Sequence, residues 1–503
     1  MPSTSTPSVR RTDARPATRG TNRWLVLVLV CLAQFMVVLD ATVVNVALPS
    51  IRTGLHFSAG DLQWVVNAYA LFFGGFLLLG GRAADLLGRQ RLFLAGIAVF
   101  TVASLLDGLS TSSGLLIAGR ALQGLGGALV SPAALSIITT SFSDGAERTR
   151  ALGIWSAIAA GGGAFGLLLG GILTDAASWR WVFFVNVPVG VAALLLSLRL
   201  VPNSRAEGVR GGVDVAGAVT VTGGLMVLVY AIVQAQSSGW FAPETLLLGA
   251  VAAGLLAAFV AIERRFEPPL IRLGIFRKRA LAGADAVMLL AAGGLFAMFF
   301  FASLYVQGIL GYSPLRAGLA FLPVTAGIGG GAGAAQGLIR RFGVRAVAIT
   351  GMVVATAGLL LLTRLTAHGG YLTDLLPGLL VMSLGMGLVF VPITLLATSG
   401  VDDADAGLAS GLLNTAQQVG GALGLALLST LAGDRTAGAL TALHHAPTAA
   451  DQADALLSGF HVAFVAAALL MAAAAVLLAV IVRGRDVVRV EDADEAGPVA
   501  DAA

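Results

Sequence analysis

Long apolar stretches alternate with short polar connections along nearly the whole chain. A helix rises about 1.5 Å per residue, so roughly 20 mostly apolar residues are needed to cross about 30 Å of lipid hydrocarbon. We predict that each stretch meeting this requirement is a membrane-spanning helix. The fourteen predicted spans cover residues 24–48, 62–81, 92–109, 114–139, 150–173, 181–200, 213–234, 244–262, 282–308, 317–338, 346–363, 374–398, 406–430 and 460–482.

The positions of the basic residues test this count independently. Cytoplasmic loops of membrane proteins carry an excess of Lys and Arg, and one missed span would exchange the two sides in every later loop. With a cytoplasmic N-terminus, 25 of the 31 Lys and Arg residues fall on the inner side, five fall on the outer side, and Arg120 lies within a span. This bias predicts an even number of spans with both termini in the cytoplasm.

Two arginine-bearing connections, at 199–212 and 263–280, divide the spans into groups of six, two and six. We therefore predict an all-α integral membrane protein with two six-helix bundles and an inserted two-helix hairpin. Duplicated six-helix halves are typical of secondary transporters. The predicted parts are a disordered basic tail (1–23), an N-terminal bundle (24–200), two extra helices with their linkers (201–280), a C-terminal bundle (281–482) and a disordered acidic tail (483–503).

Composition excludes a soluble protein of this length. Hydrophobic residues make up 57% of the 503 positions and charged residues only 12%, whereas soluble domains average about 25% charged. The net charge is +4, but the basic residues are scattered through short loops. We interpret them as topology signals and expect no nucleic-acid partner.

A single acidic residue, Asp40, lies inside the first predicted span. A charge near the middle of a bilayer costs about 2.5 to 3.5 kcal/mol on insertion scales, so such a residue has a partner, a water-filled cavity or a function. A carboxyl group whose surroundings alternate between dry and wet can bind and release a proton. We predict that Asp40 carries protons; the alternative is an aspartate that only holds helices together.

Arg120 in the fourth predicted span is the natural partner of Asp40. At 1.5 Å per residue, Arg120 lies about 9 Å and Asp40 about 12 Å below the outer surface. We predict that the two side chains interact directly or through water and couple proton binding to transport. The alternative is that Arg120 lines a cavity alone.

Small residues recur at helical spacing on two predicted spans. Gly124, Gly127 and Ser131 continue the face of Arg120, and the fifth span carries Gly162, Gly166 and Gly170. Such spacing lets helix backbones approach closely. The sequence leaves open whether these faces pack statically or slide during rocking of the bundles.

Scattered polar residues within the spans describe a weakly polar cavity suited to lipophilic molecules. The candidates to line it are Gln34, Asn45, Asn67, Tyr69, Gln123, Trp155, Gln307, Asn414 and Gln417. The sequence contains no phosphate-binding loop, no His-Glu-x-x-His helix and no Gly-x-Ser-x-Gly elbow. We therefore expect no enzyme activity, no cofactor and no metal site.

At these residues the sequence resembles the major facilitator superfamily, specifically its branch of fourteen-span drug/proton antiporters. The segment Gly-Arg-Ala-Ala-Asp-Leu-Leu-Gly-Arg-Gln-Arg from Gly81 is similar to the family loop between spans two and three. The resemblance implies a cytoplasmic charge latch at Asp85 and Arg89, with Gly81 and Gly88 in the same motif. The surroundings of Asp40 resemble the first-span motif implicated in coupling, and Arg120, Gln123 and Gly124 resemble the fourth-span motif associated with proton transfer.

The fifth-span antiporter motif is altered, because Leu167 stands between Gly166 and Gly170-Gly171 where the family usually has proline. The resemblance implies a monomeric, multi-pass protein of the bacterial cytoplasmic membrane. It would export lipophilic drugs or antibiotics by alternating access in exchange for protons, driven by the proton gradient. Import or exchange of metabolites by the same fold, or a receptor that does not transport, are the alternatives.

Overall fold

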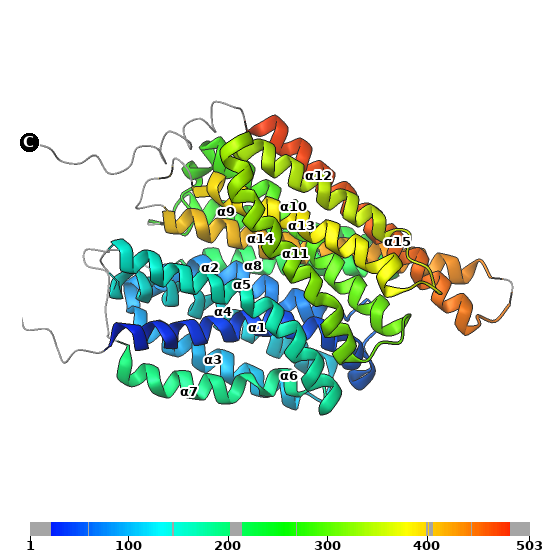
Figure 1. The fold of residues 1–503 in the computed structure, drawn as a ribbon, viewed down its shortest axis with the longest axis horizontal. Helices are drawn as coiled ribbons and strands as arrows, with labels where there is room; N and C mark the ends of the chain where they lie inside the picture. Colours follow the sequence, from blue (N-terminus) through cyan, green and yellow to red (C-terminus); the bar gives the residue numbers. More distant parts are fainter. Residues whose placement is uncertain are drawn as a thin grey trace, which may run out of the picture.

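The computed structural model of the protein describes residues 22–58, 60–142, 145–201, 214–267, 269–398, 401, 406–443 and 445–482. Within these residues the chain is helical and contains no strand. The helices (Figure 1) are α1 (Arg23–Leu55), α2 (Trp64–Leu87), α3 (Arg89–Leu109), α4 (Ser113–Ser141), α5 (Gly145–Ala176), α6 (Trp181–Phe184), α7 (Asn186–Leu200), α8 (Val215–Ser238), α9 (Pro243–Glu263), η1 (Leu273–Arg277), α10 (Arg279–Gly308), α11 (Pro314–Phe342), α12 (Val344–Leu362), η2 (Tyr371–Leu375), α13 (Leu376–Thr398), α14 (Ala406–Thr441) and α15 (Ala449–Ile481).

Twelve helical segments in the described part of the chain are long and apolar enough to cross a membrane. Two further long helices lie outside this set, α5 with 32 residues and α14 with 36 residues. The prediction of an all-helical membrane protein is therefore confirmed with about twelve candidate spans. The count of fourteen and the side on which the termini lie stay predictions.

The helices form two groups, which Figure 1 shows below and above the middle of the molecule. In the first group, α1 packs on α4 and α5, and α4 packs on α2 and α3. In the second group, α10 packs on α14 and α15, and α13 packs on α11 and α12. The groups meet where α5 contacts α11, α2 contacts α14, and α1 contacts α10.

The pair α8 and α9 packs outside this arrangement. The two helices contact each other, and α8 also contacts α2 and α14. The Thr430 hydroxyl of α14 donates a hydrogen bond to the Ile232 carbonyl of α8 at 3.2 Å. The pair therefore lies along the line where α2 of one group meets α14 of the other.

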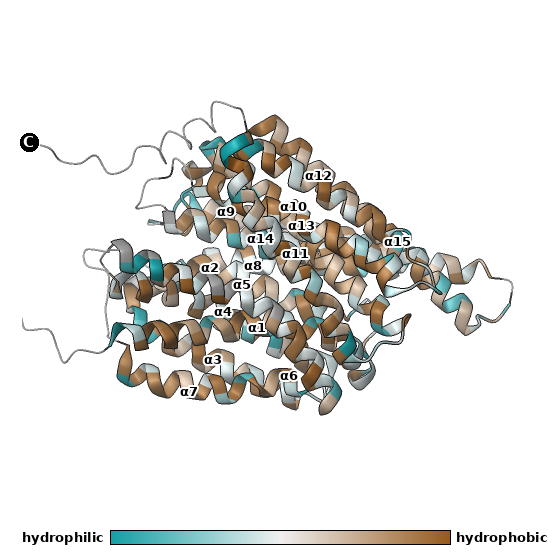
Figure 2. Ribbon diagram, viewed as in Figure 1, coloured by the Kyte–Doolittle hydropathy of each residue, from teal (hydrophilic) through white to brown (hydrophobic). Residues whose placement is uncertain are grey.

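Most helices consist largely of hydrophobic residues, shown in brown in Figure 2, and many large apolar side chains are exposed. Exposed examples are Leu195 on α7, Leu247 on α9 and Leu469 on α15. An extended apolar surface is unfavourable in water and suits contact with lipid, while the helices satisfy their own backbone groups.

Helix α1 runs seven residues past its predicted end at residue 48 and includes Pro49. Proline has no N–H to bond the carbonyl four residues earlier, which leaves the Asn45 carbonyl free. The Ser303 hydroxyl of α10 donates to that carbonyl at 2.7 Å. Helix α1 therefore continues through Pro49, and the carbonyl that the proline leaves unbonded takes part in a contact between the two groups of helices.

The sixth predicted span is interrupted, because α6 ends at Phe184 and α7 begins at Asn186. Pro188 cannot donate to the Phe184 carbonyl, so the regular hydrogen-bond pattern stops there. The Asn186 side chain, at the start of α7, is buried within the first group of helices.

Candidate functional site

A buried ion pair between Asp40 of α1 and Arg120 of α4 lies at the centre of the first group of helices. The Arg120 Nη1 donates to the Asp40 Oδ2 at 2.6 Å. The relative exposure is 0% for Asp40 and 1% for Arg120. Because burial of an isolated charge is costly, each side chain compensates the other. The predicted contact between these two residues is present.

Two amide side chains complete the surroundings of the Asp40 carboxylate. The Gln123 Nε2 donates to the Asp40 Oδ1 at 2.7 Å, and the Asn186 Nδ2 donates to the same oxygen at 2.8 Å. Gln123 also contacts the hydroxyl of Ser104 on α3 at 2.7 Å. Each carboxylate oxygen therefore has a donor, as a buried ionised carboxylate requires.

The guanidinium of Arg120 is held by several partners at once. Its Nε donates to the Val65 carbonyl of α2 at 2.9 Å, and its Nη1 also donates to the Gln123 Oε1. The guanidinium carbon lies 4.4 Å from the centre of the Tyr69 ring, a cation–π contact. The planar guanidinium makes these contacts through separate, fixed nitrogens, an arrangement that a compact lysine ammonium does not reproduce.

The glycines of α5 allow it to lie directly on α1, the helix that carries Asp40. A side chain at Gly166 would collide with Thr42, and one at Gly170 would lie 2.6 Å from the Val43 carbonyl oxygen. Gly162 faces Val38 at a distance of 3.1 Å from its would-be Cβ. These small residues are therefore needed for close packing in this conformation; their role as an antiporter motif stays a prediction.

Gly171 and Leu167 on α5 contact α11 of the second group. A Cβ at Gly171 would lie 2.6 Å from the Pro314 carbonyl oxygen, and a Cβ at Gly318 would lie 2.6 Å from the Leu167 carbonyl oxygen. The leucine that replaces the usual motif proline is itself buried, with 2% exposure. This part of α5 is thus a contact surface between the two groups of helices.

The predicted cavity residues fall into different surroundings. Gln123 and Tyr69 belong to the Asp40–Arg120 site. Gln307 donates to the Val46 carbonyl across the junction of the two groups at 2.8 Å. The side chains of Asn45 and Asn414 donate to carbonyls of their own helices. The Asn67 side chain donates to the Gln63 side chain at 3.5 Å. Trp155 packs against the hydrophobic core of the first group. Gln34 has a buried Oε1 without a hydrogen-bond partner, and Gln417 is partly buried.

The predicted latch lies at the junction of α2 and α3. Gly88 joins the two helices with a φ of 106°, a conformation that favours glycine. Arg89 is the first residue of α3, and Gly81 faces Pro132 of α4. The side chain of Asp85 lies outside the described residues, so a latch between Asp85 and Arg89 stays a prediction.

Sequence reasoning missed three members of the site. Asn186 and Ser104 contribute hydrogen bonds, and Asp107 of α3 is buried near Arg120. Asp107 could have been noticed because it is an acidic residue inside the predicted third span. Asn186 reaches Asp40 from a position 146 residues away in the sequence, which the hydropathy pattern does not indicate.

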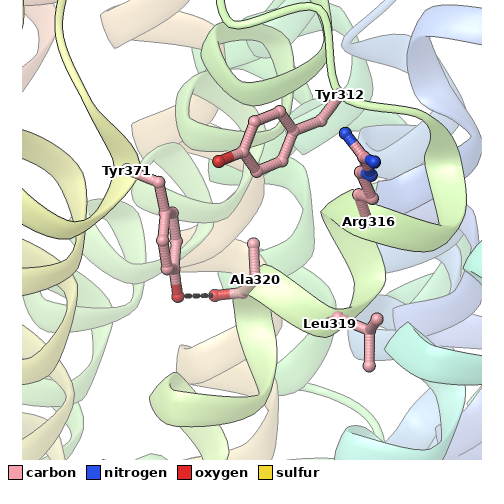
Figure 3. A pocket seen from close by; sticks show the side chains of 5 residues that line it. All are labelled: Tyr312, Arg316, Leu319, Ala320 and Tyr371. Carbon is pink, nitrogen blue, oxygen red and sulfur yellow. Dashed lines mark hydrogen bonds between the residues drawn. The ribbon is translucent and has the colours of Figure 1, made fainter.

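A separate open pocket of about 320 Å³ lies on the surface of the second group of helices. On one side of the pocket, the Tyr371 hydroxyl donates a hydrogen bond to the Ala320 carbonyl at 2.8 Å, and Tyr312 and Arg316 lie on the other side (Figure 3). None of its lining residues belongs to the Asp40–Arg120 site or to the predicted cargo cavity. We therefore assign no part of the transport site to it.

The fold and this site define a membrane transporter, and comparison with known proteins identifies its family. A model of the Major Facilitator Superfamily matches residues 30–425, so the chain belongs to that superfamily and is a transporter, not an enzyme. A bacterial homologue of the human lysosomal transporter Spinster, solved in an inward-facing and occupied conformation, shares the fold. Its TM-score is 0.67 with 16% identity, over 94% of this chain and 99% of that chain.

Several relatives are resistance or export proteins for antibiotics. The puromycin resistance protein of Streptomyces alboniger is 43% identical over 94% of this chain and 93% of its own length. The cephamycin export protein of Amycolatopsis lactamdurans is 44% identical over 82% of this chain and 85% of its own length. The lincomycin resistance protein of Streptomyces lincolnensis is 36% identical over 84% of this chain and 86% of its own length.

Proposed function

We propose that the protein exports lipophilic antibiotics or drugs across the bacterial cytoplasmic membrane in exchange for protons. The observation that carries the proposal is the buried Asp40–Arg120 pair, surrounded by neutral hydrogen-bond donors. A buried carboxylate of this kind can change its protonation only if its charged partner moves or water reaches it. Proton binding would therefore be coupled to a rearrangement of the helices that hold the pair.

The proposed topology has fourteen spans with both termini in the cytoplasm. The lengths of α5 and α14, 32 and 36 residues, support their inclusion, because about 20 residues suffice to cross the bilayer. The proposed moving bodies are the predicted bundles at 24–200 and 281–482, with the extra pair in 201–280 between them. Of the proposed tails at 1–23 and 483–503, residues 1–21 and 483–503 lie outside the described residues, whereas Arg23 is the first residue of α1.

The contacts between α5 and α11 support alternating access. The two helices touch through Leu167, Gly171 and Gly318, where the proposed topology has the outer side. Toward the other end, a Cβ at Gly161 of α5 or at Gly333 of α11 would meet no atom of the described residues within 4 Å. We infer a conformation closed outside and open toward the cytoplasm, able to receive cargo from the cell.

The antibiotic-exporting relatives support this direction of transport and the class of cargo. Inward movement of a proton to Asp40 would release Arg120 from its ion pair and free the guanidinium to change partners. The energy would come from the proton gradient, with no cofactor. Puromycin is the first cargo to test, because one of the most similar relatives confers resistance to it.

Transport should be measured in inverted membrane vesicles with an acidified interior, where an exporter accumulates cargo. We expect vesicles containing the wild-type protein to accumulate puromycin, cephamycin or lincomycin, and to lose this accumulation when the pH gradient is collapsed. Asp40→Asn should insert normally but fail to accumulate cargo, because it cannot exchange a proton.

The matched control is Asp175→Asn, which removes an exposed aspartate at the end of α5. Accumulation should persist in this variant. Proton-driven accumulation by Asp40→Asn at the wild-type rate would refute the proposed coupling, and accumulation only in right-side-out vesicles would indicate import.

A further inference from the structure

A second acidic side chain, Asp107, is buried in the last turn of α3. Its relative exposure is 0%, and neither carboxylate oxygen has a hydrogen-bond partner in the described structure. Nearly all buried polar side chains in proteins are hydrogen-bonded. An unbonded, buried carboxyl group therefore requires an explanation.

The carboxyl of Asp107 faces α4 at the position of Gly119. A side chain at Gly119 would collide with the Asp107 carboxyl, so the missing side chain makes room for it directly beside Arg120. Arg120 and Asp40 both lie within electrostatic reach of Asp107. Arg180 also lies close by, but its guanidinium donates to the backbone carbonyls of Gly108 and Ser110.

A chain of hydrogen bonds leads from the same face of α3 to Asp40. Ser104 lies three residues before Asp107, so the two side chains project from one side of the helix. The Ser104 hydroxyl contacts Gln123, and Gln123 donates to Asp40, each at 2.7 Å. Asp107 is about 3 Å from the end of α3, whereas Arg120 is about 10 Å from the start of α4. The Asp107 carboxyl thus reaches from the end of α3 to the level of Gly119, next to Arg120.

The charges of this cluster do not balance if both carboxyl groups are ionised. Arg120 is one positive charge, and its direct ion pair is with Asp40. An ionised carboxylate buried without a partner or hydrogen bond is strongly unfavourable, and the bound proton removes this cost. With Asp40 ionised and paired, Asp107 is stable in the neutral form.

We propose that Asp107 is a second proton-binding site, which holds a proton while Asp40 is ionised and passes it to Asp40 when Arg120 changes partner. In this step the O–H bond at Asp107 breaks, an O–H bond forms at Asp40, and the guanidinium pairs with the new Asp107 carboxylate. The proton count and the net charge of the cluster are unchanged. The inference rests on the proposed function, in which Asp40 exchanges protons.

Infrared spectroscopy of the purified, full-length protein in lipid tests the inference without cargo or gradient. The wild-type protein should show the C=O band of a protonated, buried carboxylic acid at neutral pH, and Asp107→Asn should lose that band. Asp40→Asn should lose it as well, because Arg120, freed from its partner, then pairs with an ionised Asp107. Asp107→Glu should keep a shifted band, which separates loss of the proton from misfolding.

Two controls make the assignment specific. Asp285 of α10 is also buried with unbonded oxygens, so Asp285→Asn identifies any band that this residue contributes. Asp175→Asn should leave the spectrum unchanged. An unchanged carboxylic acid band in Asp107→Asn would overturn the inference, and so would a band that persists at full intensity in Asp40→Asn. Either result leaves the vesicle assay of Asp40→Asn unaffected, so failure of the inference is distinguishable from failure of the proposed function.

Discussion

The contact between α5 and α11 gives a prediction about the conformational equilibrium. In Gly318→Val, the new Cβ would lie 2.6 Å from the Leu167 carbonyl oxygen, whereas ordinary contacts begin at 3.4 Å. The two helices would therefore have to separate by about 0.8 Å at this point. The perturbation acts only on the conformation in which these two helices touch here.

The size of the effect follows from the cost of overpacking. Added methyl groups in a packed contact cost about 1 to 3 kcal/mol. Such a difference shifts a two-state equilibrium by about 5- to 150-fold. We expect Gly318→Val to depopulate the conformation described above in favour of one in which α5 and α11 are apart, and to slow transport because the closed contact must form once in each cycle.

Spin labels at positions 175 and 316 can report this separation, because Asp175 and Arg316 are both exposed near the contact. The single cysteine, Cys31, is buried and would be replaced by serine before labelling. The distance distribution between the labels should gain a longer component in Gly318→Val. Gly329→Val on the same helix is the matched control, because a Cβ there meets no described atom within 4 Å.

Equal distance distributions for Gly318→Val, Gly329→Val and the wild-type protein would refute this reasoning. They would mean that the contact through Leu167 and Gly318 does not limit the separation of the helices. A lower melting temperature with no change in distance would also count against it, because the strain would then act on folding and not on conformation.

Three further predictions concern the buried site and the packing of the second group. Arg120→Lys should abolish proton-driven accumulation in vesicles although the positive charge remains, because a compact ammonium does not reproduce the separate Nε and Nη1 donors that bond Val65 and Asp40. Asn186→Leu should reduce accumulation by about tenfold or more, since a hydrogen bond to a charged group contributes about 1.5 to 3 kcal/mol; wild-type rates would contradict this. Gly424→Leu should lower the melting temperature of the purified protein, because any side chain there collides with the backbone of α10.

The transmembrane pattern and the central ion pair could be predicted from sequence because each follows from a strong energetic requirement. The number of consecutive apolar residues decides whether a helix can span the membrane. The charges of Asp40 and Arg120 need to compensate each other, which requires that they lie at similar depth. The two residues lie 80 positions apart, yet their side chains are in direct contact. Charge compensation within a bilayer is therefore a useful long-range constraint.

The remaining members of the site depend on details that hydropathy does not encode. Asn186 reaches Asp40 from α7, 146 positions away in the sequence, and Asp107 is buried because Gly119 on the neighbouring helix has no side chain. Asn414, predicted to line the cargo cavity, donates to the Ser410 carbonyl of its own helix, so its place in that cavity stays a prediction. The amide of Asn414 thus shows that a polar residue within a span is an ambiguous signal until the face of its helix is known.

The placement of α8 has a consequence for how an oily molecule could enter from the membrane itself. This helix contacts both α2 and α14, so it shields that seam between the two halves from the surrounding lipid. Among the described helices, no counterpart of α8 and α9 packs across the opposite seam, formed by α5 and α11. If the proposed topology holds, we expect lateral entry from the inner leaflet to be one-sided, along the parts of α5 and α11 that lie toward the cytoplasm in that topology.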